Sequence, residues 1–284
     1  MPARHQHLPI LLPRIAPHYA HTRWQYGNLL LRVGRYEQAF AELRRAGISD
    51  PMLAPQVIDL TWGIYQGDAS AVEAVIQPQT SAARMALAIY FAQHGKGTDA
   101  MRLFRESCRS SDQERQSLLT ALLTSKQFAA AYEVWSNNRD AGKPDNRNPV
   151  ASMIDGSFEG EIGLGDSGFG WQLNAEANAS SETNVVGLSL DSAAPSHGAR
   201  SLLINWSGNP RTTKDVVSQL VLVEPMKRYQ LSFDGRTQNL VTASAPAISV
   251  LDANAPSEAL MQSEPLPQGT TGWRKFTLSF ETGA

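Results

Sequence analysis

The stretch Trp24–Ala46 reads WQYGNLLLRVGRYEQAFAELRRA and carries the clearest structural signal in the chain. Small residues recur among large apolar ones, and Gly34 interrupts the row near its middle. Two helices that pack closely need small residues where their axes approach, and a glycine is favoured where the first helix stops. The stretch therefore predicts a pair of antiparallel helices joined by a turn at Gly34.

The turn position recurs further along the chain, at Gly67, Gly95 and Lys126, after intervals of 33, 28 and 31 residues. These intervals lie near the period of about 34 residues that is typical of helical-hairpin repeats. Small or apolar residues occupy the expected places on the second helix of each weaker copy: Val72, Ile76, Ala100, Phe104, Ala131 and Trp135. The first half of the chain is therefore predicted to be a series of helical hairpins.

The first hairpin resembles the tetratricopeptide repeat (TPR) at the positions Gly27, Gly34, Tyr36, Ala39, Ala46 and Pro51. One departure is Trp24, which falls one position later than the early tryptophan of that repeat. Such repeats stack into an α-solenoid whose concave surface holds a peptide or a partner domain. The resemblance implies a protein partner, for which Arg32 and Arg35 are candidate contacts. The alternatives are that the helices are only a spacer and that these arginines form a solvated charged face.

The row Arg139–Pro149, RDAGKPDNRNP, is polar and rich in turn residues, which is typical of a domain boundary. We expect an N-terminal segment over residues 1–20, helical repeats over 21–140, a linker over 141–150 and a β domain over 151–284. A length of 284 residues fits two compact units. The formal net charge of -2 gives no general attraction to nucleic acid or to an anionic membrane.

After the linker the apolar residues alternate with polar ones, as they do in half-buried strands. The predicted strands are Ser201–Trp206, Val216–Val223, Tyr229–Arg236, Ala247–Asp252 and Trp273–Glu281. Short strands separated by Pro, Gly, Asn and Ser, with no helical pattern between them, indicate an antiparallel β-sandwich or jelly roll. The fold class expected for the whole chain is therefore multidomain, α plus β.

The order of landmarks in this half resembles the galactose-binding-like jelly roll of many carbohydrate-binding modules. The matching segments are Gly156–Glu159, Gly170–Trp171, His197–Leu202, Gln219–Pro225, Tyr229–Phe233 and Trp273–Thr277. The family's closing strands have no counterpart before Ala284, so we expect a sandwich that lacks its last strands, as in a fragment of a longer protein. The resemblance also implies a structural calcium ion, for which Asp155 and Glu159 are candidate ligands. No other cofactor is expected.

A pyranose ring is usually bound by a flat aromatic side chain together with planar hydrogen-bonding groups. The candidate carbohydrate-binding residues are Gln219, Arg236, Asn205, Trp171 and Trp206. Trp206 shares its strand face with Leu202 and Ile204, which favours a core position for it. Gln219 and Arg236 are the preferred candidates because each is polar on an otherwise apolar strand.

The sequence carries no recognisable set of catalytic residues. Its histidines lack the spacing of a metal-binding helix, and the glycine-rich row Gly163–Gly168 is not followed by a helical pattern or by a Lys-Ser/Thr pair. Cys108 is the only cysteine, which excludes an intrachain disulfide and favours a packing role. The sequence does not decide whether a pair of carboxylates for glycoside hydrolysis exists, because the distance between two carboxylates depends on the three-dimensional fold.

The sequence therefore predicts a non-catalytic binding protein, in which the TPR half recruits a protein partner and the β-sandwich half binds carbohydrate. By resemblance, this domain pairing suggests bacterial polysaccharide assembly or export. One alternative is a purely protein–protein scaffold with a structural sandwich, and another is a non-catalytic region of a larger glycan-active enzyme. The run Leu8–Ile15 is too short and too broken by prolines for a signal peptide or membrane span. The compartment, envelope or cytoplasm, is not predicted.

Overall fold

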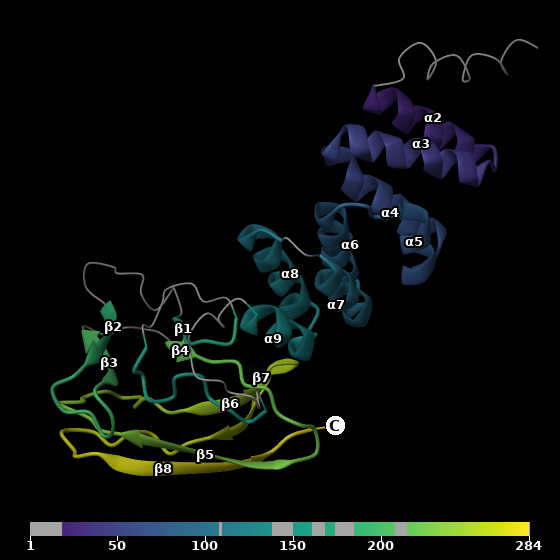
Figure 1. Cartoon of the computed structure of the whole chain (residues 1–284). Helices are drawn as coiled ribbons and strands as arrows, with labels where there is room; N and C mark the ends of the chain where they lie inside the picture. Colours follow the sequence, from purple (N-terminus) through teal and green to yellow (C-terminus); the bar gives the residue numbers. More distant parts are fainter. Residues whose placement is uncertain are drawn as a thin grey trace, which may run out of the picture. The chain divides into compact units, whose positions relative to one another are not determined.

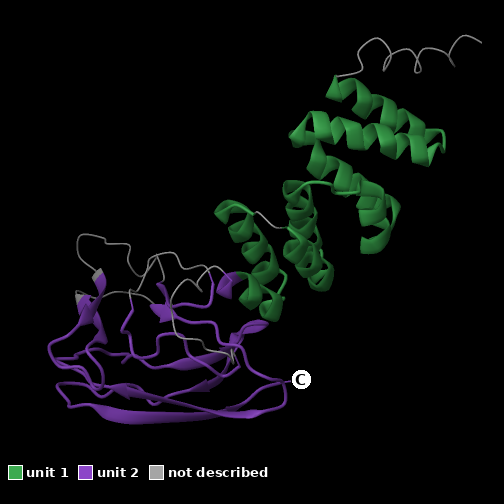
Figure 2. Ribbon diagram, in the orientation of Figure 1, with its two compact units in different colours: residues 1–134 green, residues 135–284 purple. Residues whose placement is uncertain are grey.

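The computed structural model describes residues 19–107, 110–137, 150–160, 168–173, 185–207 and 215–283 (Figure 1). The chain divides into two compact units, Met1–Val134 and Trp135–Ala284 (Figure 2). Cys108, most of the predicted linker and most of the glycine-rich row lie outside the described residues.

The described part of the N-terminal half contains eight α-helices and one short 3-10 helix. The helices follow one another in pairs, and each pair is joined by a turn of three or four residues (Figure 1). Contacts pack α2 on α3, α4 on α5 and α6 on α7, and α6 also contacts α8. Their bounds are α2 (Ala20–Arg32), α3 (Tyr36–Ser49), η1 (Pro51–Leu53), α4 (Ala54–Ile64), α5 (Ala69–Ile76), α6 (Ser81–Gln93), α7 (Gly97–Glu106), α8 (Asp112–Thr124) and α9 (Phe128–Ser136).

All four predicted turn positions adopt the left-handed backbone conformation. The φ angles are +76° at Gly34, +78° at Gly67, +75° at Gly95 and +60° at Lys126. At the first turn Gly34 N–H donates to the carbonyl of Leu31 at 3.0 Å, and the next N–H reaches back to Leu30 at 2.9 Å. The turns after α6 and α8 repeat these bonds. This pattern satisfies carbonyl groups that the helix end leaves open, so the predicted turns are confirmed.

Small residues allow the close approach of α2 and α3. A Cβ atom on Gly27 would lie 2.7 Å from Cγ of Leu43, which is closer than packed atoms tolerate. Ala39 and Ala46 on α3 are completely buried, as their spacing predicts. Phe40 and Leu43 form a core cluster with Val57 of α4, which joins the first pair of helices to the second.

The C-terminal half contains short antiparallel strands. In the described residues they pair as β1 with β4, β2 with β3, β5 with β8 and β6 with β7. The chain is therefore of mixed α and β class, with helices first and strands second. The strand bounds are β1 (Gln172–Leu173), β2 (Val185–Asp191), β3 (Ser201–Ser207), β4 (Val217–Ser218), β5 (Arg228–Gly235), β6 (Ser249–Asp252), β7 (Ala255–Gln262) and β8 (Arg274–Glu281).

Alternation along β5 and β8 places their apolar side chains on one face. The cross-strand partners include Leu231 with Leu278 and Phe233 with Phe276. The two phenylalanine rings stack with their centroids 5.1 Å apart, and Leu278 is buried. Residues directly opposite in an antiparallel pair are the contacts that stabilise a sheet. This face is the packed side of the strand pair.

Four of the five strand predictions match observed strands, namely β3, β5, β6 and β8. The predicted strand Val216–Val223 is largely wrong, because only Val217 and Ser218 join a ladder there. Leu222 makes an isolated bridge with Val150 instead. The sequence missed β1, β2 and β7. Every residue of β7 is exposed, so this strand has no apolar alternation to detect.

Candidate functional site

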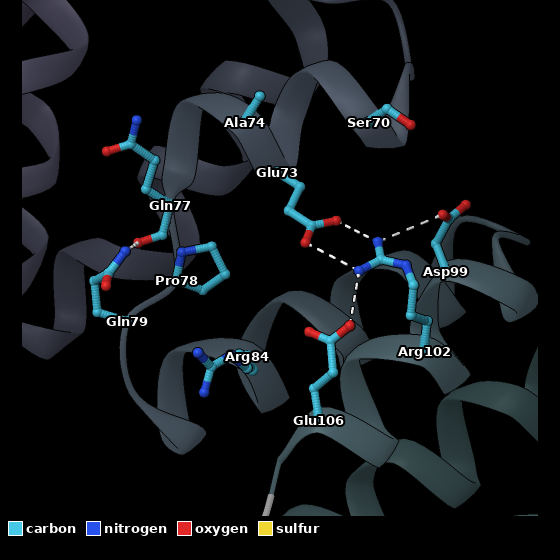
Figure 3. A pocket seen from close by; sticks show the side chains of 10 residues that line it. All are labelled: Ser70, Glu73, Ala74, Gln77, Pro78, Gln79, Arg84, Asp99, Arg102 and Glu106. Atoms are coloured by element: carbon cyan, nitrogen blue, oxygen red, sulfur yellow. Dashed lines mark hydrogen bonds and ion pairs between the residues drawn. The ribbon is translucent and has the colours of Figure 1, made fainter.

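A charged groove of about 580 Å³ lies between α5 and α7. Figure 3 shows Glu73, Asp99 and Glu106 pointing toward the guanidinium of Arg102. Arg102 binds both carboxylate oxygens of Glu73, with one contact at 3.1 Å, and it reaches Glu106 at 3.3 Å. The hydrogen bonds to Glu73 are the main cause that raises the pKa of Arg102. The guanidinium is therefore already occupied by the protein's own carboxylates, and it ties α5 to α7.

Similar polar links join each second helix of a pair to the next one. Arg44 on α3 donates to the carbonyl of Val75 on α5 at 2.5 Å. Arg105 on α7 donates to both carboxylate oxygens of Glu133 on α9, at 2.8 and 2.7 Å. This hydrogen bonding, followed by the charge of Glu133, raises the pKa of Arg105. Together with the link between Glu73 and Arg102, these contacts connect α3, α5, α7 and α9, so the charges here serve the fold.

A second groove, of about 460 Å³, lies between α6 and α8 and is lined without any charged side chain. Its polar lining includes Gln93 from α6 and Gln116, Ser117, Thr120 and Thr124 from α8. The hydroxyls of Ser117 and Thr120 each donate to a carbonyl of their own helix at 2.9 Å, which leaves their oxygens able to accept. Amides and hydroxyls of this kind suit the N–H and C=O groups of an extended peptide.

An aromatic cluster joins α4 to α6, and its members are Trp62, Tyr90 and His94. The ring of His94 stacks on Tyr90 at 4.2 Å and lies 4.7 Å from Trp62. The hydroxyl of Tyr90 donates to Asp59 at 2.9 Å. Burial, and then the hydrogen bond to Asp59, raise the pKa of Tyr90. Sequence reasoning missed both the groove and this cluster, because helical spacing alone does not say which residues of neighbouring helices meet.

The predicted partner contacts Arg32 and Arg35 are exposed at the turn between α2 and α3. Within the part of the chain that the structure describes, neither guanidinium has an ion-pair or hydrogen-bond partner. Arg23 differs from them, because it binds Glu42 at 2.9 Å. Arg32 and Arg35 therefore remain available for a ligand.

Gln219, a preferred carbohydrate candidate, is engaged with the protein's own backbone. Its side-chain amide donates to the carbonyl of Ile154 at 2.7 Å and accepts from the N–H of Ile154 at 3.1 Å. Trp171 is engaged in the same region, because its indole N–H donates to the carbonyl of Asp155 at 2.9 Å. Its ring also stacks on Phe158 at 4.8 Å. Both side chains hold the 150–160 segment in place.

The proposed calcium ligands Asp155 and Glu159 accept backbone N–H groups. The two oxygens of Asp155 accept from Glu159 at 2.8 Å and from Gly160 at 2.9 Å. Glu159 Oε1 accepts from Ala199 at 2.7 Å. Two motifs that carried the jelly-roll resemblance, Gly156–Glu159 and His197–Leu202, are thereby joined. In the described ranges no three Asp, Glu, His or Cys side chains form a metal-binding group.

The remaining carbohydrate candidates lie in two other places. The guanidinium of Arg236 lies over the ring of Trp273, 5.1 Å from its centroid, and contacts Asp191 at 3.3 Å. Asn205 and Trp206 are exposed neighbours on β3, so they point to opposite faces of the strand and cannot hold one ligand together. The core position favoured for Trp206 is wrong, because this side chain is 37% exposed. The five candidates do not form one site.

Ser196, His197 and Asp234 form a further polar cluster that the sequence did not indicate. Ser196 Oγ donates to Asp234 at 2.6 Å, and His197 Nδ1 lies 3.0 Å from Ser196 Oγ and 3.2 Å from Asp234. A Ser-His-Asp triad needs the serine and the aspartate on different ring nitrogens. Here both face Nδ1, so the arrangement does not activate the serine.

These observations define a two-part chain, with paired helices in the N-terminal half and small antiparallel sheets in the C-terminal half. Comparison of the sequence with protein-family models and with curated proteins finds no match. Among the described residues, no helix has the length and apolar character needed to cross a membrane.

Proposed function

We propose that the chain is a non-catalytic scaffold whose helical half, a TPR-like α-solenoid, recruits a protein partner. The observation that carries the proposal is the uncharged groove between α6 and α8. An extended peptide offers one N–H and one C=O per residue, and each buried group needs a hydrogen-bond partner. Gln93, Ser117 and Thr120 offer both donors and acceptors for them. Without a charged group in the lining, such a partner is bound mainly by its backbone and apolar side chains.

The distribution of charge supports this choice of surface. On the second helices, Arg102 and Arg105 are held by Glu73 and Glu133. A ligand there would have to displace existing ion pairs. In the groove between α6 and α8, by contrast, the side-chain amide of Gln93 has no hydrogen-bond partner in the described part of the chain.

A Thr120→Arg variant tests this proposal, because Thr120 lines the groove and is exposed on its helix. Arginine is a good helix former, so the fold is retained while the groove is filled. The matched control is Thr98→Arg, the same change at an exposed position of α7. The measurement is affinity purification from the native cells. We expect wild type and Thr98→Arg to retain a protein partner that Thr120→Arg loses. Equal recovery by all three proteins would refute the groove as the binding surface.

A second function, carbohydrate binding by a jelly-roll-like β-sandwich, is favoured by one observation: the stacked pair of Arg236 and Trp273. The pair combines a flat ring with a planar hydrogen-bond donor, as sugar sites usually do. The context proposed for both functions together is bacterial polysaccharide assembly or export. If the pair is structural, the chain is a protein–protein scaffold. The third alternative, a region of a larger glycan-active enzyme, requires additional catalytic sequence.

A glycan array distinguishes these readings of the strand half. Binding by wild type that Arg236→Ala loses and Gln219→Ala keeps, in folded protein, would support the Arg236 and Trp273 pair as the sugar site. If only Gln219→Ala loses glycan binding, the loss would be explained by the missing hydrogen bonds to Ile154. Absence of any bound glycan would leave the scaffold reading.

A further inference from the structure

The turn end of the first helix pair carries an exposed surface that combines apolar and cationic side chains. Leu29, Val33 and Tyr36 are 37%, 61% and 51% exposed. Single exposed apolar residues are ordinary, but a group of them that adjoins unpaired charges indicates an interaction surface. We call this surface the tip patch, and its members are Leu29, Arg32, Val33, Arg35 and Tyr36.

The backbone brings these five residues together. Arg32 and the C-cap residue Val33 follow Leu29 by three and four positions, so both are its neighbours at the end of α2. The tight turn at Gly34, closed by the bond from Arg35 N–H to the carbonyl of Leu30 at 2.9 Å, places Arg35 and Tyr36 directly after them. The patch therefore rests on a turn that the fold itself fixes.

Arg35 occupies a position where it gives the helix no support. It is the N-cap residue of α3, and its side chain makes no capping hydrogen bond. At the corresponding position before α5, Asp68 accepts from the N–H of Ala71 at 3.1 Å. A cation at a helix N-terminus also faces the positive end of the helix dipole. The side chain of Arg35 is therefore not held by the helix that it precedes, so its charge is available to a partner.

We propose that the tip patch binds an acidic segment of a protein partner. Partner carboxylates would pair with Arg32 and Arg35, and an apolar partner side chain would cover Leu29, Val33 and Tyr36. The inference rests on the proposed function in one respect: it takes the helical half to be a partner-binding unit. It adds the chemistry of the partner and a second contact surface.

The number of basic residues in the tip patch favours an acidic peptide over an anionic membrane or a nucleic acid. Recognition of anionic lipid typically takes a cluster of four to eight basic residues. The tip patch has two, and the exposed Glu37 lies next to it. Nucleic acid would similarly require an extended basic surface, whereas the whole chain has a net charge of -2. Two arginines beside three apolar side chains suit a short acidic and apolar peptide.

The test uses fluorescence anisotropy with a labelled peptide in which pairs of glutamate alternate with leucine or phenylalanine. Two control peptides replace every glutamate by lysine or every apolar residue by serine. The full chain should bind the first peptide and neither control. An Arg35→Asp variant should bind about fivefold more weakly, as expected for the loss of a good exposed ion pair. Added salt should weaken wild-type binding.

A folding defect cannot mimic this result, because Arg35→Asp introduces an N-cap residue of the preferred kind and should raise the Tm. The matched control is Lys96→Asp, because Lys96 is the N-cap of α7 and also makes no capping bond. Both variants should gain thermal stability, but only Arg35→Asp should lose the peptide. Equal peptide affinity of the two variants would overturn the proposal.

Further outcomes separate this proposal from the groove between α6 and α8. Thr120→Arg should bind the acidic peptide like wild type. If wild type binds the lysine peptide equally well, or prefers phosphatidylserine vesicles, the tip patch proposal fails. If the natural partner is still lost through Thr120→Arg, only the tip patch proposal fails and the groove proposal stands. If the peptide is lost only through Arg35→Asp while Thr120→Arg keeps the natural partner, the groove fails and the tip patch stands.

Discussion

The side-chain amide of Gln219 pairs with the backbone of Ile154 on both sides, accepting from its N–H at 3.1 Å and donating to its carbonyl at 2.7 Å. The two residues are 65 positions apart in the chain. The amide side chain thus makes the two hydrogen bonds that a neighbouring strand would otherwise make to Ile154. Gln219 is thus an internal anchor of the 150–160 segment.

Replacing Gln219 by alanine should lower the free energy of unfolding of the strand half by about 1–3 kcal/mol, since both backbone groups of Ile154 lose their partner. Gln219→Glu should be at least as damaging, because a carboxylate would face the carbonyl of Ile154. The exposed Gln230 on β5 is the control, and its change to alanine should be nearly neutral. Urea unfolding measures all three. A neutral Gln219→Ala would contradict the anchoring role.

Gly198→Ala should destabilise the strand half more than an ordinary glycine change. Its φ is +71°, and an added Cβ would lie 2.0 Å from Oε1 of Glu159, the acceptor that holds this loop. Gly269 is a matched control, with φ of +81° and open space around the Cβ position. Gly269→Ala therefore reports the backbone cost alone, about 1–2 kcal/mol. Thermal unfolding should show the larger loss for Gly198→Ala, and equal losses would argue against the contact with Glu159.

Lys126→Gly should stabilise the helical half by up to about 1 kcal/mol. Lys126 holds the left-handed position after α8, with φ of +60°, where the corresponding residues Gly34 and Gly95 carry no Cβ. Lys126→Ala is the control, because it removes the same side chain and keeps the strained Cβ. Chemical denaturation followed by helical circular dichroism compares the two. The expectation is wrong if alanine proves as stabilising as glycine.

Tyr90→Phe should cost about 0.5–1 kcal/mol near neutral pH, through loss of the hydrogen bond to Asp59. Burial and Asp59 raise the pKa of Tyr90 above its ordinary value of 10.0, so the unfolded state releases the phenolic proton first as pH rises. The contribution of Tyr90 to stability is therefore complete below about pH 10 and declines above it. Urea unfolding of wild type and variant over this range should show their difference shrinking. A difference that stays constant would contradict the role of Asp59.

The turns of the helical half were predictable from sequence because a left-handed residue after a helix is a local requirement. Gly34, Gly67 and Gly95 are residues that adopt the left-handed conformation readily, and the repeat spacing identified Lys126 as the fourth such position. The small residues Gly27, Ala39 and Ala46 were recognisable for a similar reason, since close helix packing restricts side-chain size. Local geometry and repetition thus carried the fold prediction.

The candidate sites depended on contacts between distant segments, and these could not be predicted. A polar residue on an apolar stretch, such as Gln219, looks the same in sequence whether it faces a ligand or its own backbone. The pairing of Arg236 with Trp273, and that of Glu159 with the loop at Gly198, are likewise tertiary. The groove between α6 and α8 needed the packing of two helices that are not consecutive. Arg32 and Arg35 were chosen as candidates because they lie on the most clearly marked repeat, and their role as partner contacts stays a prediction.

Site-specific photo-crosslinking tests the central claim, recruitment of a protein partner through the groove between α6 and α8, most directly. A photoreactive amino acid would replace Gln93 in the groove, and in a second protein Thr98 on the exposed surface of α7. After illumination in the native cells, the Gln93 position should give a discrete crosslink to one protein, identified by mass spectrometry, and the Thr98 position should not. Crosslinks of equal strength from both positions, or none from Gln93, would contradict the claim.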